Sequence, residues 1–379
     1  LYEVLISYFI FLKFYMTKEK FVVFILCMCA TAIAAAQPKT DHFLEKILQD
    51  NQNKIFQDVL KYKDSFRVQI IYTQINRDKH NKPSFTNYYF NNDTNLYFNP
   101  ASTVKLPLAL LAMEKFNDMS IKGVTKYTSI QIDSSYPRQV KLYEDSTSEN
   151  GLPSIAHFIK KVFLISDNDA YNRLYQFIGQ QTINRNLHSK GYIGTRITRQ
   201  FMGFTPEENR HTNAVRFLNN KSELIYTQPQ AYNTDSFYFG KPVKIGRAYY
   251  NSNDSLINEP IDFTRVNNLP LYDLQQMLQS VLFPESVPVA QRFRLSKDDY
   301  DFVYRFLSQY PSETSYPKYD SKVYYDSYVK YFFMDSTHVM PYGVRVFNKV
   351  GWAYGFLTDV SYVGDFKNNI EYMLSATVY

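Results

Sequence analysis

Apolar and polar positions divide the chain into strand-like runs near its two ends and helical repeats elsewhere. Between residues 41 and 62, apolar side chains return every three or four positions, which predicts a helix. Runs rich in β-branched and aromatic residues predict five strands, the last of which alternates with polar positions. These strands are expected at 66–75, 87–98, 344–350, 356–363 and 370–378.

The middle of the chain is predicted to be mostly helical. Residues 101–116 are apolar nearly all round, which indicates a buried helix. Residues 214–268 are polar and aromatic with little periodicity, which is typical of loops and short hairpins in an insertion. Further helices are expected at about 154–165, from there on to about 178, and at 270–283 and 296–309.

This order of elements predicts an α+β fold. Strands from both ends join one antiparallel sheet flanked by helices, and an all-helical lobe is inserted between them. We expect the sheet lobe at about 37–100 and 338–379 and the helical lobe at about 101–310. A cleft between two such lobes is the usual place for an active site.

The first 36 residues have the pattern of a secretory signal peptide. Lys18 and Lys20 precede an apolar run, 21–36, which ends in three alanines before Gln37. Residues 1–15 are interpreted as an over-extended start, with Met16 as the first residue. The alternative, one long membrane anchor, is disfavoured by the charges between residues 13 and 20. We therefore expect an exported protein, periplasmic or extracellular, whose mature chain has no membrane segment.

Cysteine usage and charge exclude several classes of chemistry. Both cysteines, Cys27 and Cys29, lie in the signal segment, so disulfides and thiol catalysis are not expected in the mature chain. A lipoprotein anchor at Cys29 is disfavoured by the large Met28 before it. The 42 basic and 36 acidic residues form no long blocks, which argues against a nucleic-acid partner.

No metal site or cofactor is expected from the sequence. The six histidines are scattered, and phosphate-binding glycine loops and zinc-protease motifs are missing from the sequence. The chemistry has to come from ordinary side chains.

A Ser-x-x-Lys motif, Ser102 to Lys105, opens the buried helix. Residues three apart share a helix face, so the hydroxyl and the amine can meet. Burial lowers the pKa of an amine, which makes Lys105 a possible base for a serine nucleophile. The alternative is that Ser102 only caps the helix and Lys105 reaches out to solvent. Two other matches have weaker context: Ser315/Lys318 contains Pro317, and Ser327/Lys330 lies in a polar, tyrosine-rich stretch.

Two more short motifs follow in the chain. Ser166-Asp-Asn168 precedes a helix, and its residue types are also those preferred as helix caps. Lys349-Val-Gly351 lies in a predicted strand that two further strands follow. A second Lys-x-Gly, Lys244 to Gly246, lies in the irregular middle and is less favoured.

The three segments together resemble those of class A β-lactamases and penicillin-binding proteins. FNPASTVKLPLALLA at 98–112, with Pro107 inside the helix, resembles the nucleophile segment. ISDNDAYNRL at 165–174 and the stretch 346–363 resemble the second and third motifs. The resemblance implies a β-lactamase/transpeptidase-like fold.

The resemblance also implies a role for each motif residue. Ser102 attacks a carbonyl, Lys105 acts as its base, and Ser166 relays a proton to the leaving group. Asp167 is structural, and Asn168 and Lys349 bind a substrate amide and a substrate carboxylate. Gly351 lets the strand approach the substrate, and the backbone N–H groups of Ser102 and Trp352 form the oxyanion hole.

The chain departs from the family pattern in ways that affect turnover. Val350 stands where the family has a hydroxyl residue, which removes one hydrogen bond to a substrate carboxylate. The glutamate that activates the deacylating water in class A enzymes has no clear counterpart. Glu207 and Glu208 lie in about the right stretch, but the residues around them do not match, and both also suit the first turn of a helix.

We therefore expect residues 37–379 to be a single catalytic domain, a serine hydrolase that acts on a lactam or amide through an acyl-enzyme. Its partner is a small molecule, either a β-lactam or a peptidoglycan-like amide, and deacylation is expected to be slow. The alternatives are a peptidoglycan D,D-peptidase-like acyl hydrolase and a non-catalytic binding protein on the same scaffold.

Overall fold

The computed structural model describes residues 39–251 and 253–379, and residues 40–379 form one compact unit. The predicted signal peptide, the start at Met16 and both cysteines lie outside the described residues. Within the described ranges, we find no helix with the length and apolarity needed to cross a membrane.

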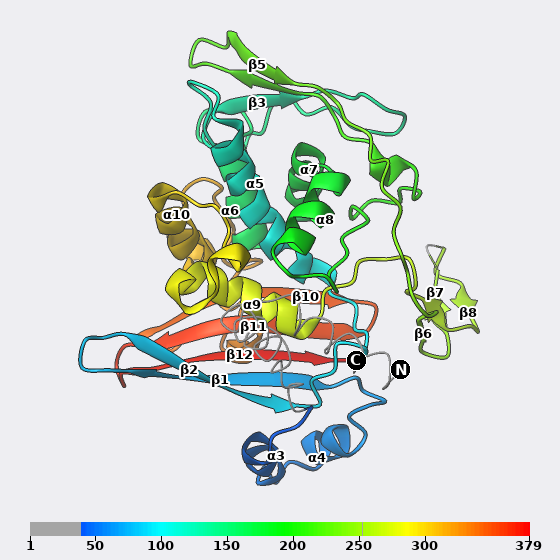
Figure 1. Ribbon diagram of the computed structural model, residues 1–379, viewed down its shortest axis with the longest axis vertical. Helices are drawn as coiled ribbons and strands as arrows, with labels where there is room; N and C mark the ends of the chain where they lie inside the picture. Colours follow the sequence, from blue (N-terminus) through cyan, green and yellow to red (C-terminus); the bar gives the residue numbers. More distant parts are fainter. Residues whose placement is uncertain (1–38, 252) are drawn as a thin grey trace, which may run out of the picture. The chain divides into compact units, whose positions relative to one another are not determined.

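A five-stranded antiparallel sheet joins the two ends of the unit (Figure 1). Its strand order is β10-β11-β12-β1-β2, so the first strand pairs with the last. The predicted sheet built from N- and C-terminal strands is confirmed. The strands are β1 (Gln69–Arg77), β2 (Pro83–Phe90), β10 (Val344–Ala353), β11 (Phe356–Asp365) and β12 (Ile370–Val378).

Helices cover both faces of this sheet (Figure 1). On one face, Gln275 of α9 (Leu271–Leu282) bonds both β1 and β12, through Thr73 at 2.8 Å and Ser375 at 2.7 Å. The other face is covered by α3 (His42–Gln49) and α4 (Lys54–Lys61). Buried apolar residues fix these two helices to the sheet: Leu44, Leu60, Val68 and Phe90.

The single helix predicted for 41–62 is therefore wrong in one respect, because the structure divides it into α3 and α4. Asn53 caps α4 by accepting a hydrogen bond from the Phe56 backbone N–H at 3.0 Å. The side chain of Asn51 accepts one from the Asn53 N–H at 2.8 Å, which stabilises the turn between the helices.

The inserted lobe is built around α5 (Lys105–Met119), whose residues 105–114 are all buried. Helices α6 (Ile155–Leu164), α7 (Asn168–Ile178), α8 (Gln180–Ser189) and α10 (Lys297–Ser308) complete the helical part of the lobe. The short 3₁₀ turns are η1 (Ala101–Val104), η2 (Glu208–Arg210), η3 (Pro284–Ser286), η4 (Val289–Gln291), η5 (Pro311–Glu313) and η6 (Tyr331–Phe333).

The lobe is not purely helical, in contrast to the expectation. A three-stranded sheet is formed by β3 (Ser129–Ile132), β4 (Val215–Leu218) and β5 (Leu224–Gln228). Its strands have four or five residues, too few for a clear alternation in the sequence. Two small hairpins follow within 214–268: β6 (Lys244–Ile245) with β9 (Ile261–Asp262), and β7 (Tyr249–Tyr250) with β8 (Leu256–Ile257).

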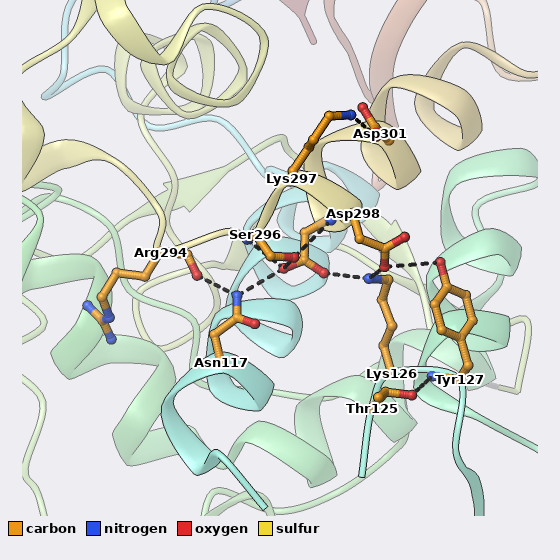
Figure 2. A network of polar contacts seen from close by, with 10 residues as sticks. Asn117, Thr125, Lys126, Tyr127, Arg294, Ser296, Lys297, Asp298 and Asp301 are labelled. Carbon is orange, nitrogen blue, oxygen red and sulfur yellow. Dashed lines mark hydrogen bonds and ion pairs between the residues drawn. The ribbon is translucent and has the colours of Figure 1, made fainter. Parts of the chain in front are cut away.

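A polar network fastens the start of α10 to the end of α5 (Figure 2). Asp299 accepts hydrogen bonds from Lys126 Nζ at 2.6 Å and from Asn117 Nδ2 at 2.9 Å. Ser296 and Asp299 form a capping box at the start of α10. This network fixes α10, which packs on β10, relative to the central helix.

Candidate active site

Ser102 lies in a tight turn that joins the sheet lobe to the central helix. Ala101 has a positive φ of 44°, and its N–H donates to Asn99 Oδ1 at 2.8 Å. Both the N–H and the hydroxyl of Thr103 donate to the Pro100 carbonyl, at 2.9 and 2.7 Å. A left-handed alanine is strained, and such strain collects at functional sites where surrounding bonds maintain it.

Lys105, the first residue of α5, is completely buried. Its Nζ donates to Ser102 Oγ at 2.8 Å, to Asn168 Oδ1 at 2.7 Å and to Ser166 Oγ at 3.2 Å. A further bond runs to the Ser166 backbone carbonyl. Burial lowers the pKa of Lys105 well below its usual value, and the positive charge of Lys349 acts in the same direction. In its neutral form the amine can instead accept the Ser102 hydroxyl proton across the same 2.8 Å contact, which makes it a base for that hydroxyl.

The Ser166-Asp-Asn168 turn serves both as a helix cap and as part of this cluster. Asp167 Oδ1 accepts a hydrogen bond from the Ala170 N–H at 2.7 Å, which caps α7. Ser166 itself has a positive φ of 60°. The cap thus falls to the middle residue, while the Ser166 and Asn168 side chains both contact the amine of Lys105.

Lys349 enters from β10 and completes the cluster. Its Nζ donates to Ser166 Oγ at 2.8 Å and to the Val350 carbonyl at 3.0 Å. The side chain is buried, and this burial lowers its pKa to about 7, although the negative charge of Asp359 opposes the shift. Lys244, the alternative lysine, lies exposed on β6, and none of its contacts in the described residues involves the cluster.

Gly351 allows the turn that carries Ser102 to lie directly on β10. A Cβ atom at this position would lie 2.5 Å from the Pro100 carbonyl oxygen and 3.1 Å from Thr103 Cγ2. Only glycine permits that approach. Sequence-distant motifs therefore meet because α5, α7 and β10 all converge on this turn.

Two cavities meet at Ser102. The polar cavity, about 480 Å³, is lined among others by Asn99, Arg199, Phe201 and Asn267. The tyrosine cavity, about 680 Å³, is lined among others by Ser166, Tyr325, Tyr328 and Tyr331. Ser102, Asn168 and Trp352 line both, and the Trp352 side chain is 73% exposed.

The structure does not bring Glu207 or Glu208 to this cluster. Glu208 accepts from Arg138 Nη1 at 2.9 Å and from the Thr205 N–H at 2.6 Å, so its carboxylate is engaged in its own turn. Glu207 lies 3.3 Å from His211. The Phe201 ring lies beside the amine instead, with its centroid 5.2 Å from Lys105 Nζ.

Sequence reasoning missed three features of the site. Phe201 and Arg199 belong to an irregular segment without a periodic signal. Within the described part of the chain, no hydrogen bond or ion pair engages the half-buried Arg199 guanidinium. The tyrosine cavity has a signal in the sequence, the tyrosine-rich stretch around residues 322–331. That stretch counted against Ser327 as a nucleophile, but it did not lead to the prediction of a cavity.

The arrangement has the parts needed for serine acyl transfer. A hydroxyl contacts a buried amine, a second hydroxyl bridges that amine and a second lysine, and an amide side chain lies beside them. Nucleophile and base are within hydrogen-bond reach, which is the geometric requirement for covalent catalysis.

Comparisons with known proteins agree with the motifs. The model of the beta-lactamase enzyme family matches residues 51–233, a range that contains Ser102 and Ser166 but not Lys349. No curated protein matches the chain.

Several solved structures are similar at low identity. A β-lactamase from Desulfarculus baarsii is 14% identical, with 85% of this chain and 86% of that chain covered and a TM-score of 0.45. A variant of the reconstructed last common ancestor of Gram-negative class A β-lactamases is 14% identical, with coverage of 85% and 86% and a TM-score of 0.44. PBP-A is 13% identical, with 85% of both chains covered and a TM-score of 0.45. Such distant similarities do not bear on activity. The family-model match confirms the resemblance that the motifs predicted, because residues 51–233 match the model of the beta-lactamase enzyme family.

Proposed function

We propose that this protein is a serine acyl hydrolase in which Ser102 forms an acyl-enzyme with a lactam, amide or ester. The observation that carries the proposal is the 2.8 Å contact between Ser102 Oγ and the fully buried amine of Lys105. A pure binding protein has no need of a desolvated lysine in contact with a serine hydroxyl that directly follows the strained Ala101. We also propose residues 37–379 as the catalytic domain and an exported location, on the basis of the signal-peptide pattern at the start of the chain.

In the proposed acylation, the neutral amine of Lys105 takes the proton from Ser102 Oγ as the oxygen attacks the carbonyl carbon. The backbone N–H groups of Ser102 and Trp352 stabilise the developing oxyanion. As the bond to the leaving group breaks, Ser166 donates its hydroxyl proton to that group. Ser166 regains a proton from Lys105, with which it shares a 3.2 Å contact, and Lys349 holds Ser166 in place.

The proposed deacylation is slow. It requires a base that activates water, and Phe201, an apolar ring, lies beside Lys105 while Glu207 and Glu208 are engaged elsewhere. Loss of a general base typically costs about 10²–10⁴-fold in rate. A peptidoglycan D,D-peptidase-like acyl hydrolase, whose acyl-enzyme passes the acyl group to water slowly, is the second candidate and is favoured by the same Phe201 contact.

Covalent labelling tests the proposal. A small fluorophosphonate and a reporter penicillin should each add to the purified protein, and peptide mapping should place the adduct on Ser102. Ser102→Ala should abolish labelling, whereas Ser315→Ala and Ser327→Ala should label as the native protein does. Mass spectrometry should then show a penicillin adduct that decays slowly.

Two outcomes would contradict the proposal. Undiminished labelling of Ser102→Ala would place the nucleophile elsewhere, and a folded protein that neither reagent labels would leave only the binding function. Rapid penicillin turnover without an adduct would instead overturn the slow deacylation step.

A further inference from the structure

The wall of the tyrosine cavity is a segment between α10 and β10. This segment contributes five lining residues, Tyr325, Tyr328, Val329, Tyr331 and Met334, and Ser102 and Ser166 line the same cavity. Val350 and Leu357 from the sheet line the floor. At about 680 Å³, the cavity has the size of a site that takes a small organic group.

This wall is built rigidly. The Nζ of Lys330 is buried and donates to the carbonyls of Leu307 and Val346, at 3.1 and 2.8 Å, and to Asn348 Oδ1 at 2.7 Å. Asn348 Nδ2 in turn donates to the Val329 carbonyl at 2.8 Å. The segment is thus bonded to α10 and to β10 from inside. A preformed cavity of this kind imposes a shape on what binds it.

The charge of the lining also limits which groups can bind in the tyrosine cavity. None of the described residues that line it is charged. Lys349 is bonded to Ser166 and Val350, and Lys105 is bonded to Ser102, Ser166 and Asn168, but neither lysine lines either cavity. Arg199 lines the polar cavity but not the tyrosine cavity. An anionic group in the tyrosine cavity would therefore lose hydration without contacting a cationic side chain.

The position of Ser166 indicates which part of the substrate binds in the tyrosine cavity. In the proposed function, Ser166 protonates the leaving group, and Ser166 lines the tyrosine cavity but not the polar cavity. We propose, resting on that function, that the tyrosine cavity takes the leaving group of the substrate and that this group is uncharged and aromatic or branched alkyl. The acyl part, together with any anionic group, then lies in the polar cavity with Asn168 and Arg199.

A matched pair of esters tests this assignment. In both, Ser102 Oγ bonds to the acetyl carbon, the carbon–oxygen bond to the phenol breaks, and the phenol leaves with the proton from Ser166. The probes are 4-tert-butylphenyl acetate and 4-(carboxymethyl)phenyl acetate, because their phenols have similar acidity and differ in charge and apolar surface. Phenol release in a single turnover gives the acylation rate. We expect the tert-butyl ester to react at least about tenfold faster, as the burial of several methyl groups implies.

Variants of the wall and floor sharpen the test. Tyr328→Ala should reduce the preference for the tert-butyl ester, while Tyr342→Ala, which removes a 91% exposed tyrosine outside the cavity, should leave it unchanged. Leu357→Lys places an ammonium group on the cavity floor and should accelerate the carboxymethyl ester. Because Leu357 is 40% exposed, this variant should fold even if Tyr328→Ala does not.

The outcomes separate this inference from the proposed function. If the fluorophosphonate labels Ser102 but the two esters react at equal rates, or the carboxymethyl ester reacts faster, the leaving-group assignment is wrong and the acyl hydrolase stands. If Leu357→Lys leaves the ratio of the two rates unchanged, the cavity does not hold the leaving group. If neither ester acylates Ser102 and the fluorophosphonate does not phosphonylate it, the proposed function itself fails.

Discussion

Two Ser-x-x-Lys sequences in this protein each end in a buried lysine, yet their side chains do different things. Lys105 meets the hydroxyl of its own serine at 2.8 Å. Lys330 instead bonds two backbone carbonyls and Asn348, and the hydroxyl of Ser327 is buried without a partner among the described residues. Burial lowers the pKa of Lys105 well below normal and that of Lys330 to about 7.

The difference teaches that neither the motif nor a lowered lysine pKa identifies an active site. The two lysines differ in the groups that their amines contact and in whether a cavity lies beside those groups. Ser102 opens onto two cavities, whereas the amine of Lys330 is enclosed by carbonyl oxygens and an amide. One lysine is a candidate base, and the other fixes a segment of chain.

The largest expected effects come from Lys105→Met, which should slow labelling, and Lys330→Met, which should lower stability. Lys105→Met removes the base from Ser102, so fluorophosphonate labelling should slow by about 10²–10⁴-fold while the fold persists. Lys330→Met leaves Asn348 and two carbonyls without their donor, which should lower the free energy of unfolding by about 1–3 kcal/mol. Labelling rates and urea titrations measure the two effects. Loss of labelling in Lys330→Met at unchanged stability would break the comparison.

Gly351→Ala should displace Ser102 from Lys105 and leave the contacts of Lys330 unchanged. The new Cβ, 2.5 Å from the Pro100 carbonyl, forces the turn with Ser102 away from β10. A displacement of this kind can slow acylation by about 100-fold, and the overpacking should cost about 1–3 kcal/mol of stability. Gly364→Ala on β11 is the control, because its nearest neighbours would lie at 3.6 Å. Equal labelling rates in the two variants would mean that the close approach is unnecessary.

The smallest expected effect is on the pH dependence of stability, which should reflect the buried charges of Lys330 and Asp359. The pKa of Lys330 is about 7 in the folded chain and 10.5 ordinarily, so the unfolded chain binds more protons between these values. The free energy of unfolding should therefore rise from about pH 7 to 10. Burial raises the pKa of Asp359 to about 7, which makes stability fall between about pH 4 and 7. In Lys330→Met, denaturant titrations should show a smaller rise above pH 7, and an unchanged rise would exclude Lys330 as a source.

The sheet and the polar centre of the site could be predicted from local patterns. Helical spacing alone brought Ser102 and Lys105 together, and the strand pattern after Lys349 separated it from Lys244. The alternative in which Ser166-Asp-Asn168 is only a cap was half right, since Asp167 caps α7 while its neighbours contact Lys105.

The remaining features depend on tertiary structure. Phe201 and Arg199 reach the site through an irregular segment whose path no periodicity fixes. Lys349 could be assigned to the site, but its enclosure behind Ser166 and Val350 follows from the packing of β10 on the turn at Gly351. The tyrosine cavity depends on the hydrogen bonds from Lys330 to α10 and β10. The tyrosine-rich stretch signals the side chains of the cavity, but nothing in the sequence predicts these bonds.

The pairing of β1 with β12 also has a consequence for biosynthesis. Arg77 and Glu371, 294 positions apart in sequence, are bonded at 3.0 Å across these neighbouring strands. On the ribosome, the hairpin of β1 and β2 must wait with an open edge until β12 has emerged, while the helical lobe already has its local contacts. Pairings between such distant segments form slowly. Because Lys349 lies on the same late segment, a nascent chain carries Ser102 and Lys105 long before all three motifs of the proposed site can meet.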